Sequence, residues 1–383
     1  MVQNNEERNQ LAQTKGLSAV NRRWTCGMFF WFACNLLVSL PGWAGGIAHL
    51  QWSDNSIFEL MNHTLWHVTI ALWLWIAFSA FLGWLRGSRS PSHWRVLNAL
   101  AIFPPAIYLA WVTTPWTALP LHRLTAQTDL GVADKKIANQ ENSTRLKIFS
   151  WNLLLANERY REILDTIEQA DADIVVLLEL TPGHTQGLKE LRDRYPYSQW
   201  LPRTNTRGLA ILTRIPNTTF EELDFATTGY PSLAATLPAK GENKRTTKLL
   251  AMHTSSPNLD NRFLVRDKQL AAAGKWVQEQ DSDLILVGDL NITPWSHAFR
   301  SMIRESSLRD SRDYRGFFAT WPTGLGIVGI PIDHALVSSN WRVIDRDVGF
   351  PSLGSDHQWI SVTVEKAPFD KAPFDKAPFD NAP

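Results

Sequence analysis

The spacing of hydrophobic residues changes near residue 117. Before that point the apolar residues form three long segments, whereas after it they form short runs separated by amphipathic stretches. The long segments cover about 24–50, 64–85 and 96–116. A span needs about 20 apolar residues, and only the second segment supplies them without interruption. Proline and glycine interrupt the first, and Pro104-Pro105 are expected to kink the third.

Tryptophan supports a membrane location for this part of the chain. Most of the 18 tryptophans lie before residue 117, and tryptophan favours the membrane-water interface. We therefore expect a leader at 1–23 and a transmembrane anchor of three spans at 24–116. The alternative is a helical bundle buried within a soluble protein.

Basic residues predict the orientation of the anchor, because they concentrate in cytoplasmic loops. The leader carries four of them and the loop at 86–95 carries three, whereas the loop at 51–63 carries none. The leader is therefore expected inside the cell, and the loop at 51–63 and everything after residue 117 outside the cytoplasm. This pattern is typical of an integral protein of the bacterial inner membrane with an extracytoplasmic domain.

The remainder of the chain divides into three parts. Residues 117–144 show no apolar period and are expected to be a linker. Residues 366–383 repeat the sequence KAPFD, which predicts a disordered tail. Between them, 145–365 alternates apolar runs with amphipathic helices, as α/β and α+β domains do.

Short apolar runs predict the strands of this domain. Amphipathic spacing predicts helices at 159–170 and 263–278, and Thr293-Pro294 is expected to start another helix. The strand candidates lie at 146–154, 173–180, 208–214, 247–255, 283–291, 332–339, 341–348 and 359–365.

Polar side chains lie at the ends of several of these apolar runs. Burial of an unpaired carboxylate costs several kcal/mol, so each such group needs a cation or hydrogen bonds. A single one is usually a turn or capping residue, but strand ends that collect several indicate a functional site. The set comprises Asn152, Glu179, His253, Asp289, Asn291, Asp333, Asp356 and His357.

These residue types favour metal-assisted hydrolysis. Carboxylate and amide oxygens suit Mg²⁺ or Mn²⁺, and Ca²⁺ also fits them. The chain has two cysteines, Cys26 and Cys34, both in the first apolar segment, so a cysteine zinc site in the domain is excluded. The sequence contains no nucleophile elbow, P-loop or dinucleotide fingerprint. Attack by a metal-activated water is the remaining reaction type.

The domain resembles the endonuclease/exonuclease/phosphatase superfamily of DNase I-like hydrolases over 145–365. The resemblance rests on motifs that occur in the family's order: SWNLL, the glutamate of VVLLEL, GLAILTR, HTSSP, GDLNITPWS, IDHALVS and GSDHQWISVTV. It implies a four-layer αββα sandwich that hydrolyses phosphoesters. Many members have glutamine where Leu178 stands, a departure that concerns the surroundings of the metal.

The resemblance also implies a role for each residue. Glu179 would be the main metal ligand, supported by Asn152 and Asp356. Asp289 would orient or deprotonate the attacking water.

The remaining residues would act on the phosphoryl group. Asn291 and His253 would hydrogen-bond its oxygens. His357 would be a second catalytic imidazole whose tautomer Asp333 fixes. His334 is expected to shape the motif rather than to react.

The substrate stays open at this stage. The chain has a net charge of +1, and the domain has nearly equal numbers of acidic and basic residues, unlike most nucleic-acid binders. A nucleic acid, a phospholipid headgroup or a small phosphodiester each fits. The alternatives are therefore a phosphodiesterase, a phospholipase C-like hydrolase, and a catalytically silent membrane-tethered binding module. Arg207 and Trp295 could line the substrate cleft or serve packing alone.

Overall fold

The structure is a computed structural model in which two compact units can be distinguished. It describes residues 30–47, 56–85, 92–117, 145–239, 245–257, 262–312, 318–349 and 353–366. One unit contains the helix Phe30–Ile47, α3 (Leu65–Leu85) and α4 (Ser92–Thr117) as far as Thr113. The other contains α2 (Ser56–His63) together with all the strands. The leader at 1–23, residues 118–144 of the expected linker at 117–144, and most of the KAPFD tail lie outside the described residues.

The helical unit has an apolar surface that its own packing leaves exposed. Its three helices are long and apolar enough to cross a membrane, and only 17% of the window Leu65–Leu82 is buried. Polar side chains meet inside the unit instead, where the amide of Asn35 donates to Asn98 and accepts from the indole of Trp75. Apolar surface outside with polar contacts inside is the arrangement expected of helices packed in lipid. The helix α4 runs through Pro104-Pro105, and the first helix runs through Pro41.

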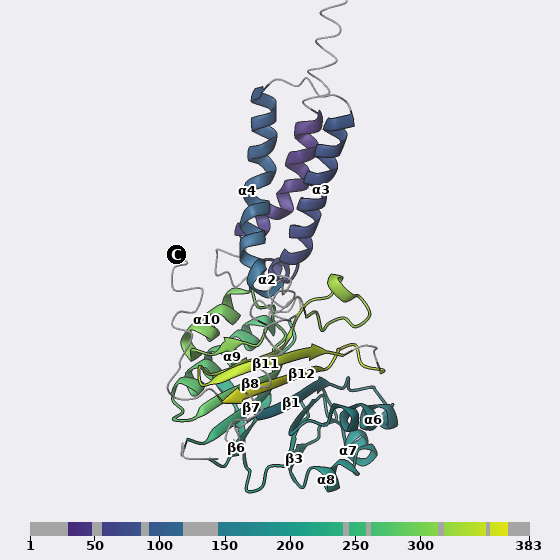
Figure 1. Cartoon of the computed structure of the whole chain (residues 1–383), viewed down its shortest axis with the longest axis vertical. Helices are drawn as coiled ribbons and strands as arrows, with labels where there is room; N and C mark the ends of the chain where they lie inside the picture. Colours follow the sequence, from purple (N-terminus) through teal and green to yellow (C-terminus); the bar gives the residue numbers. More distant parts are fainter. Residues whose placement is uncertain are drawn as a thin grey trace, which may run out of the picture. The chain divides into compact units, whose positions relative to one another are not determined.

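Two six-stranded mixed sheets form the second unit (Figure 1). The first sheet has the order β11-β12-β1-β2-β4-β3, and the second has the order β5-β6-β7-β8-β10-β9. The strands of the first sheet are β1 (Arg145–Asn152), β2 (Ile174–Leu178), β3 (Tyr197–Leu201), β4 (Leu209–Thr213), β11 (Trp341–Val348) and β12 (Ile360–Lys366). The strands of the second are β5 (Thr219–Asp224), β6 (Pro231–Leu237), β7 (Thr247–His253), β8 (Asp283–Asp289), β9 (Arg309–Asp310) and β10 (Asp333–Val337).

Each sheet contains one parallel pair of strands, and a helix makes the crossover. In the first sheet α6 (Tyr160–Ala170) connects β1 to β2, and in the second α9 (Arg262–Gln278) connects β7 to β8. Parallel neighbours require such a crossover, and all the other pairings are antiparallel. The remaining helices of this unit in the described residues are α7 (Pro182–Gly187), α8 (Leu191–Arg194), α10 (His297–Ser306) and the 3₁₀ turns η1 (Phe225–Thr227) and η2 (Gly326–Val328).

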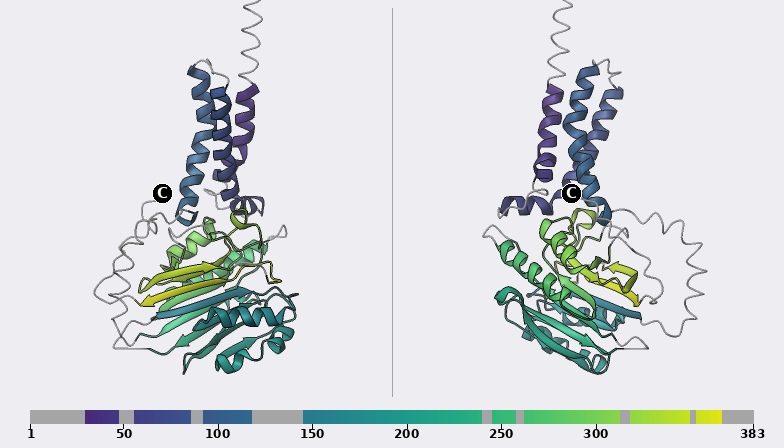
Figure 2. Two further views of the ribbon diagram at one scale, coloured as in Figure 1. Left: turned by 45° about the vertical axis from the view of Figure 1, so that its right-hand side comes forward. Right: turned by 90° about the vertical axis from the view of Figure 1, so that its left-hand side faces the viewer.

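Alternating side chains fill three layers of core, which makes the unit a four-layer sandwich. In β1, Ile148 packs between the sheets while Phe149 faces the helices α6–α8. In β8, Val287 points between the sheets while Leu286 packs under α9 and α10. Figure 2 shows the teal helices α6–α8 and the green helices α9 and α10 on opposite outer sides of the two sheets. The predicted αββα fold is confirmed, and burial on both faces explains the continuous apolar runs.

The sequence prediction for the start of α10 was wrong. The helix begins at His297 with Ser296 in the N-cap position, not at Pro294. Thr293 instead opens a turn, in which its carbonyl accepts from the amide of Ser296 and its hydroxyl meets the Ser296 hydroxyl at 2.9 Å. Both residues suit an N-cap, and the chain uses the later one.

Candidate functional site

Three of the predicted site residues lie in one row across the second sheet. His253 ends β7 and pairs in register with Asp289, which ends β8, and Asp289 pairs in register with Asp333, which begins β10. Directly paired residues on neighbouring strands point to the same face. The strand register therefore brings three side chains together that are separated by up to 80 positions in the sequence.

Gly288 allows the two central strands to approach at this level. Its φ is +143°, and a Cβ atom there would lie 2.0 Å from the carbonyl oxygen of Met252. No other residue type fits this position without moving the backbone of β7 or β8. The glycine of the GDLN motif is thus a packing requirement next to Asp289.

The first sheet contributes Asn152 and Glu179. Asn152 ends β1, and Glu179 follows the parallel neighbour β2 by one residue, with a left-handed φ of 57°. The Glu179 carboxylate accepts from the backbone amide of Leu155 at 2.8 Å. No lysine or arginine among the described residues forms an ion pair with this nearly buried carboxylate.

Asn152 connects the two sheets. Its side-chain nitrogen donates to Glu179 Oε1 at 3.2 Å and to Asp289 Oδ2 at 3.1 Å. The amide oxygen accepts from the backbone of Leu154. In this arrangement Asn152 holds two carboxylates in place by donating to them, and its oxygen points away from them.

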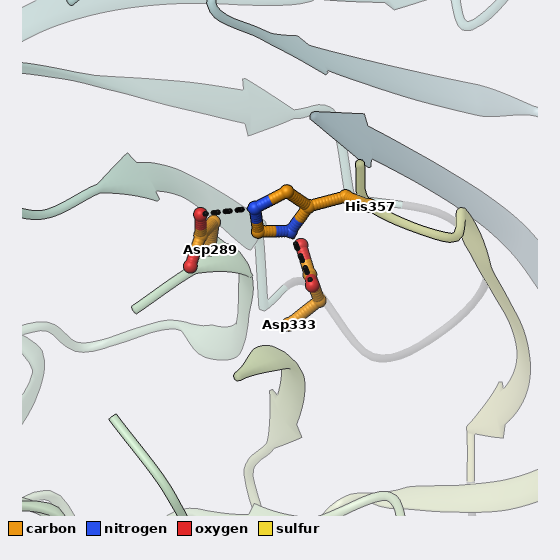
Figure 3. A group of neighbouring side chains, drawn as sticks. All are labelled: Asp289, Asp333 and His357. Carbon is orange, nitrogen blue, oxygen red and sulfur yellow. Dashed lines mark hydrogen bonds and ion pairs between the residues drawn. The ribbon is translucent and has the colours of Figure 1, made fainter. Parts of the chain in front are cut away.

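His357 lies between two carboxylates (Figure 3). Its Nδ1 is 2.9 Å from Asp333 Oδ2, and its Nε2 is 3.5 Å from Asp289 Oδ2. Burial lowers the pKa of the imidazole, but Asp333 and Asp289 outweigh burial and raise the pKa of His357 to about 10. Burial likewise opposes ionisation of Asp333, yet the facing His357 holds the pKa of that carboxyl below its usual range. The pair is therefore an imidazolium and a carboxylate.

Asp289 has the opposite tendency. Burial, reinforced by the negative charge of Asp333, raises the pKa of Asp289 despite the two nearby histidines. A carboxylate with a raised pKa is a stronger base than a solvated one, which suits general-base catalysis. His253 Nε2 lies 3.6 Å from the same carboxylate. His253 Nδ1 is 2.9 Å from the Thr206 carbonyl, which can only accept, so Nδ1 carries a proton.

The other two predicted site residues lie beside this network. Asn291 has a left-handed φ of 49°; its backbone amide donates to Asp289 Oδ1 at 2.9 Å and its side chain donates to the Thr254 carbonyl at 3.0 Å. Asp356 directly precedes His357, is half-buried, and accepts from the Trp321 indole at 3.0 Å. The structure thus brings seven of the residues into one connected cluster and places Asp356 next to it.

One group of residues here lies close enough together to hold a metal ion. Ligand atoms of Asp289, Asp333 and His357 lie within 4.8 Å of one another, which is close enough for one cation. In the present arrangement His357 occupies that space and both its nitrogens face carboxylates, so it has no lone pair free for a metal. Glu179 fits a hard cation better, because its carboxylate pairs with no lysine or arginine among the described residues.

Sequence reasoning missed several residues that hold the site together. Ser355 donates to the Asn152 carbonyl at 2.6 Å and accepts from the His357 amide at 3.0 Å, which ties the loop before β12 to β1. Trp321 positions Asp356 from a loop without any apolar pattern. Neither the spacing nor the residue type of these positions signals a role in advance.

Residues that the sequence left between two roles have defined places in the structure. Trp295 is fully buried and its indole donates to the Asn62 carbonyl, so it packs and does not line a cleft. The Arg207 guanidinium lies 4.2 Å from the ring centre of Tyr230. His334 points to the other face of β10 from Asp333, where its imidazole contacts Arg312 and the Ile292 carbonyl. Burial and Arg312 lower the pKa of His334 to about 4, which keeps it neutral.

Several solved structures are similar to this chain. A solved endonuclease/exonuclease/phosphatase family protein from Bacteroides thetaiotaomicron is 18% identical; the match covers 59% of this chain and 100% of that one, with a TM-score of 0.47. The catalytic domain of human Nocturnin with a bound sulfate anion is 20% identical, with coverage of 59% and 97% and a TM-score of 0.48. A humanized D. rerio TDP2 is 20% identical, with coverage of 57% and 98% and a TM-score of 0.47. No curated protein sequence matches the chain significantly.

The sequence model of one family covers more than half of the chain. It is the model described as Endonuclease/Exonuclease/phosphatase family, and it matches residues 149–357, a range that includes all eight predicted site residues. The chain belongs to the endonuclease/exonuclease/phosphatase family.

Proposed function

We propose that this chain is a membrane-anchored, divalent-metal-dependent phosphoesterase that cleaves phosphodiesters with its domain at 145–365. One observation carries the proposal: side chains from six separate strands and loops meet in a single buried cluster that hydrogen bonds and ion pairs connect. Uncompensated burial of so many polar groups is costly, and folds gather such groups mainly where they bind or react.

The geometry supports a division of labour between the two carboxylates that flank His357. Asp289 would accept the proton of the attacking water, since Asn152 and the Asn291 amide hold its oxygens in a fixed orientation. Asp333 would keep His357 oriented, so that the imidazole donates its Nε2 proton toward a phosphoryl oxygen. His253 would offer a second Nε2 on the same side.

The donor set fits a hard cation, Mg²⁺ or Mn²⁺, with Ca²⁺ as a further possibility. Glu179 would be its principal ligand, with Asp356 and Asn152 beside it. Asn152 would have to turn its amide over to offer the oxygen, because its nitrogen now faces Glu179. A cation bound there would polarise the phosphoester and balance the charge that develops in the transition state.

The three apolar helices would anchor the enzyme in a membrane. Their apolar sides are largely exposed, which favours lipid over water as their surroundings. The distribution of basic residues favours an extracytoplasmic catalytic domain in a bacterial inner membrane. A reporter enzyme fused after residue 130 that is active only in the cytoplasm would contradict this orientation.

The test is hydrolysis of bis(para-nitrophenyl) phosphate by the full chain in detergent, with Mg²⁺, Mn²⁺ or EDTA. We expect activity that depends on metal and that falls by roughly three orders of magnitude in Glu179→Gln. Glu190→Gln is the matched control, since Glu190 is exposed on the same unit. Full activity in EDTA, or equal activity of both variants, would remove the mechanism. A wild-type chain that binds metal but hydrolyses nothing would be a tethered binding module.

A phospholipase C-like reaction on lipid headgroups is the second candidate. Trp321, which holds Asp356, is itself exposed, and Leu325 and Val328 nearby in the same loop are more exposed still. Apolar side chains at the rim of a site favour a substrate with an apolar part. Release of phosphorylated headgroup from phospholipid vesicles, but not of nucleotides from DNA, would select this candidate.

A further inference from the structure

The short helix α2 belongs to the unit that contains the two sheets, called below the catalytic unit of the proposed function, although its sequence lies between the first and second apolar helices. It has eight residues, and residues from two consecutive turns contact the rest of the same unit. Glu59 Oε1 accepts from Arg266 Nη2 at 2.7 Å, and the carbonyl of Asn62 accepts from the indole of Trp295 at 2.5 Å. Arg266 and Trp295 are both fully buried. These contacts are interior ones and not a loose surface association.

Arg266 connects this helix to the active site. Its guanidinium, on α9, donates through Nη1 to the carbonyl oxygen of Asn291 at 3.0 Å while Nη2 binds Glu59. The amide of the same Asn291 donates to Asp289 Oδ1 at 2.9 Å. A continuous series of hydrogen bonds therefore leads from Glu59 through Arg266 and the Asn291 backbone to the proposed general base.

The segment after Asp289 needs such support. Asn291 has a left-handed backbone, which costs about 1 kcal/mol or more and persists only where the surroundings hold it. Arg266 fixes the carbonyl of Asn291, and Asn62 fixes the indole of Trp295 four residues later. Both ends of the segment 291–295 are thus tied to α2, one directly and one through Arg266.

The charges around Arg266 make Glu59 the relevant partner. Asp267 also accepts from Arg266, at 2.6 Å, but burial, reinforced by Glu59, raises the pKa of Asp267. Burial of Glu59 opposes its ionisation too, yet Arg266 and His63 outweigh burial and lower the pKa of Glu59 to about 2. Of the two carboxylates, Glu59 is therefore the one whose charged form its surroundings favour more strongly, and it is the one that α2 contributes.

We propose that Glu59 is a positioning residue of the active site, and that α2 is an integral part of the catalytic domain supplied from within the membrane anchor. The geometry also requires α2 and the catalytic domain to lie on the same side of the membrane. Catalytic competence then depends on a correctly inserted pair of apolar helices on either side of α2. The kinetic part of this proposal rests on the proposed function.

Two readouts on the full chain in detergent test it. Glu59→Ala removes the Arg266 partner, and Glu59→Gln removes the charge at nearly constant shape, in case the first variant does not fold. Asp281→Asn is the control, because Asp281 is 98% exposed and pairs with Arg245 at 2.8 Å in the same unit. The first readout is kcat and KM for bis(para-nitrophenyl) phosphate, and the second is amide hydrogen exchange of 287–296.

We expect kcat to fall between about tenfold and 100-fold in the Glu59 variants with little change in KM, as small displacements of a catalytic group do. Exchange of 287–296 should accelerate in these variants while exchange of β1 and β2 stays unchanged. Kinetics and exchange equal to those of Asp281→Asn would overturn the proposal, as would acceleration spread evenly over the unit. Amide hydrogen exchange can be measured without turnover. An inactive wild type would therefore refute the proposed function, whereas the exchange rates of 287–296 alone would decide the role of Glu59.

Discussion

The ion pair between Glu59 and Arg266 makes a quantitative prediction about stability against pH. The pKa of Glu59 is lowered from 4.5 to about 2 by Arg266, against the effect of burial. Each unit of pKa shift corresponds to about 1.4 kcal/mol, so the charged form contributes about 3 kcal/mol to stability at pH 7. This contribution is an upper bound on the stability lost in Glu59→Gln, because Asp267 stays beside Arg266 and neutralises part of its charge.

The sign of the pH dependence follows from the direction of the shift. A carboxyl with a lowered pKa in the folded state contributes its full stability above the unfolded value of 4.5 and loses it as the pH falls toward about 2. The difference in free energy of unfolding between wild type and Glu59→Gln should therefore be largest at pH 7. It should fall to roughly half by pH 3.

Calorimetry of the full chain in detergent, from pH 7 down to pH 3, measures this difference from the transition of the catalytic unit. The control is Asp281→Asn, whose exposed pair should contribute less than about 1 kcal/mol at any pH. A difference below about 0.5 kcal/mol at pH 7, within the range of ordinary surface substitutions, would refute the reasoning, and so would one that does not change with pH.

Three further predictions concern the site itself. Asp333→Asn should lower kcat by roughly 10³- to 10⁴-fold with KM little changed, because His357 loses its orienting carboxylate; an effect on KM alone would contradict this. Gly288→Ala should prevent folding or destabilise the unit by more than about 4 kcal/mol in denaturant titrations, since its Cβ would lie 2.0 Å from the Met252 carbonyl oxygen; near-normal stability would show that the strands can separate. Millimolar Mg²⁺ or Mn²⁺ should raise the thermal midpoint of the wild type in the absence of substrate, EDTA should reverse the rise, and Glu179→Ala should abolish it.

The sequence predicted the structure best where burial produces a regular or continuous apolar pattern. The run IVVLL of β2 is apolar throughout because Val175 and Val176 face two different cores, and such a run signals a strand covered on both sides. The polar residues that interrupt such runs were equally visible, because a carboxylate at the end of a buried strand contrasts with its neighbours. The alternation of these runs with helices, together with the family's motifs, was enough to predict the αββα sandwich.

Other elements have no such apolar pattern. The strand β5 is mostly exposed and carries three acidic residues, so its sequence TFEELD resembles a loop or a helix start. The helix α2 has only eight residues, and its fit to the catalytic unit depends on Arg266 and Trp295, more than 200 positions later. Contacts between such distant residues are not encoded in local spacing.

His253, Asp289 and Asp333 lie in one register row of the sheet, and this has a consequence for how the protein folds. Side chains alternate between faces along a strand, so a slip of β8 by a single residue against β7 or β10 would turn Asp289 into the opposite core and leave the two outer groups without their middle partner. A slip by one residue would therefore remove Asp289 from the cluster altogether and not merely displace it. Turnover, once detected, would therefore serve as a direct gauge of how many molecules in a preparation have reached the native strand alignment.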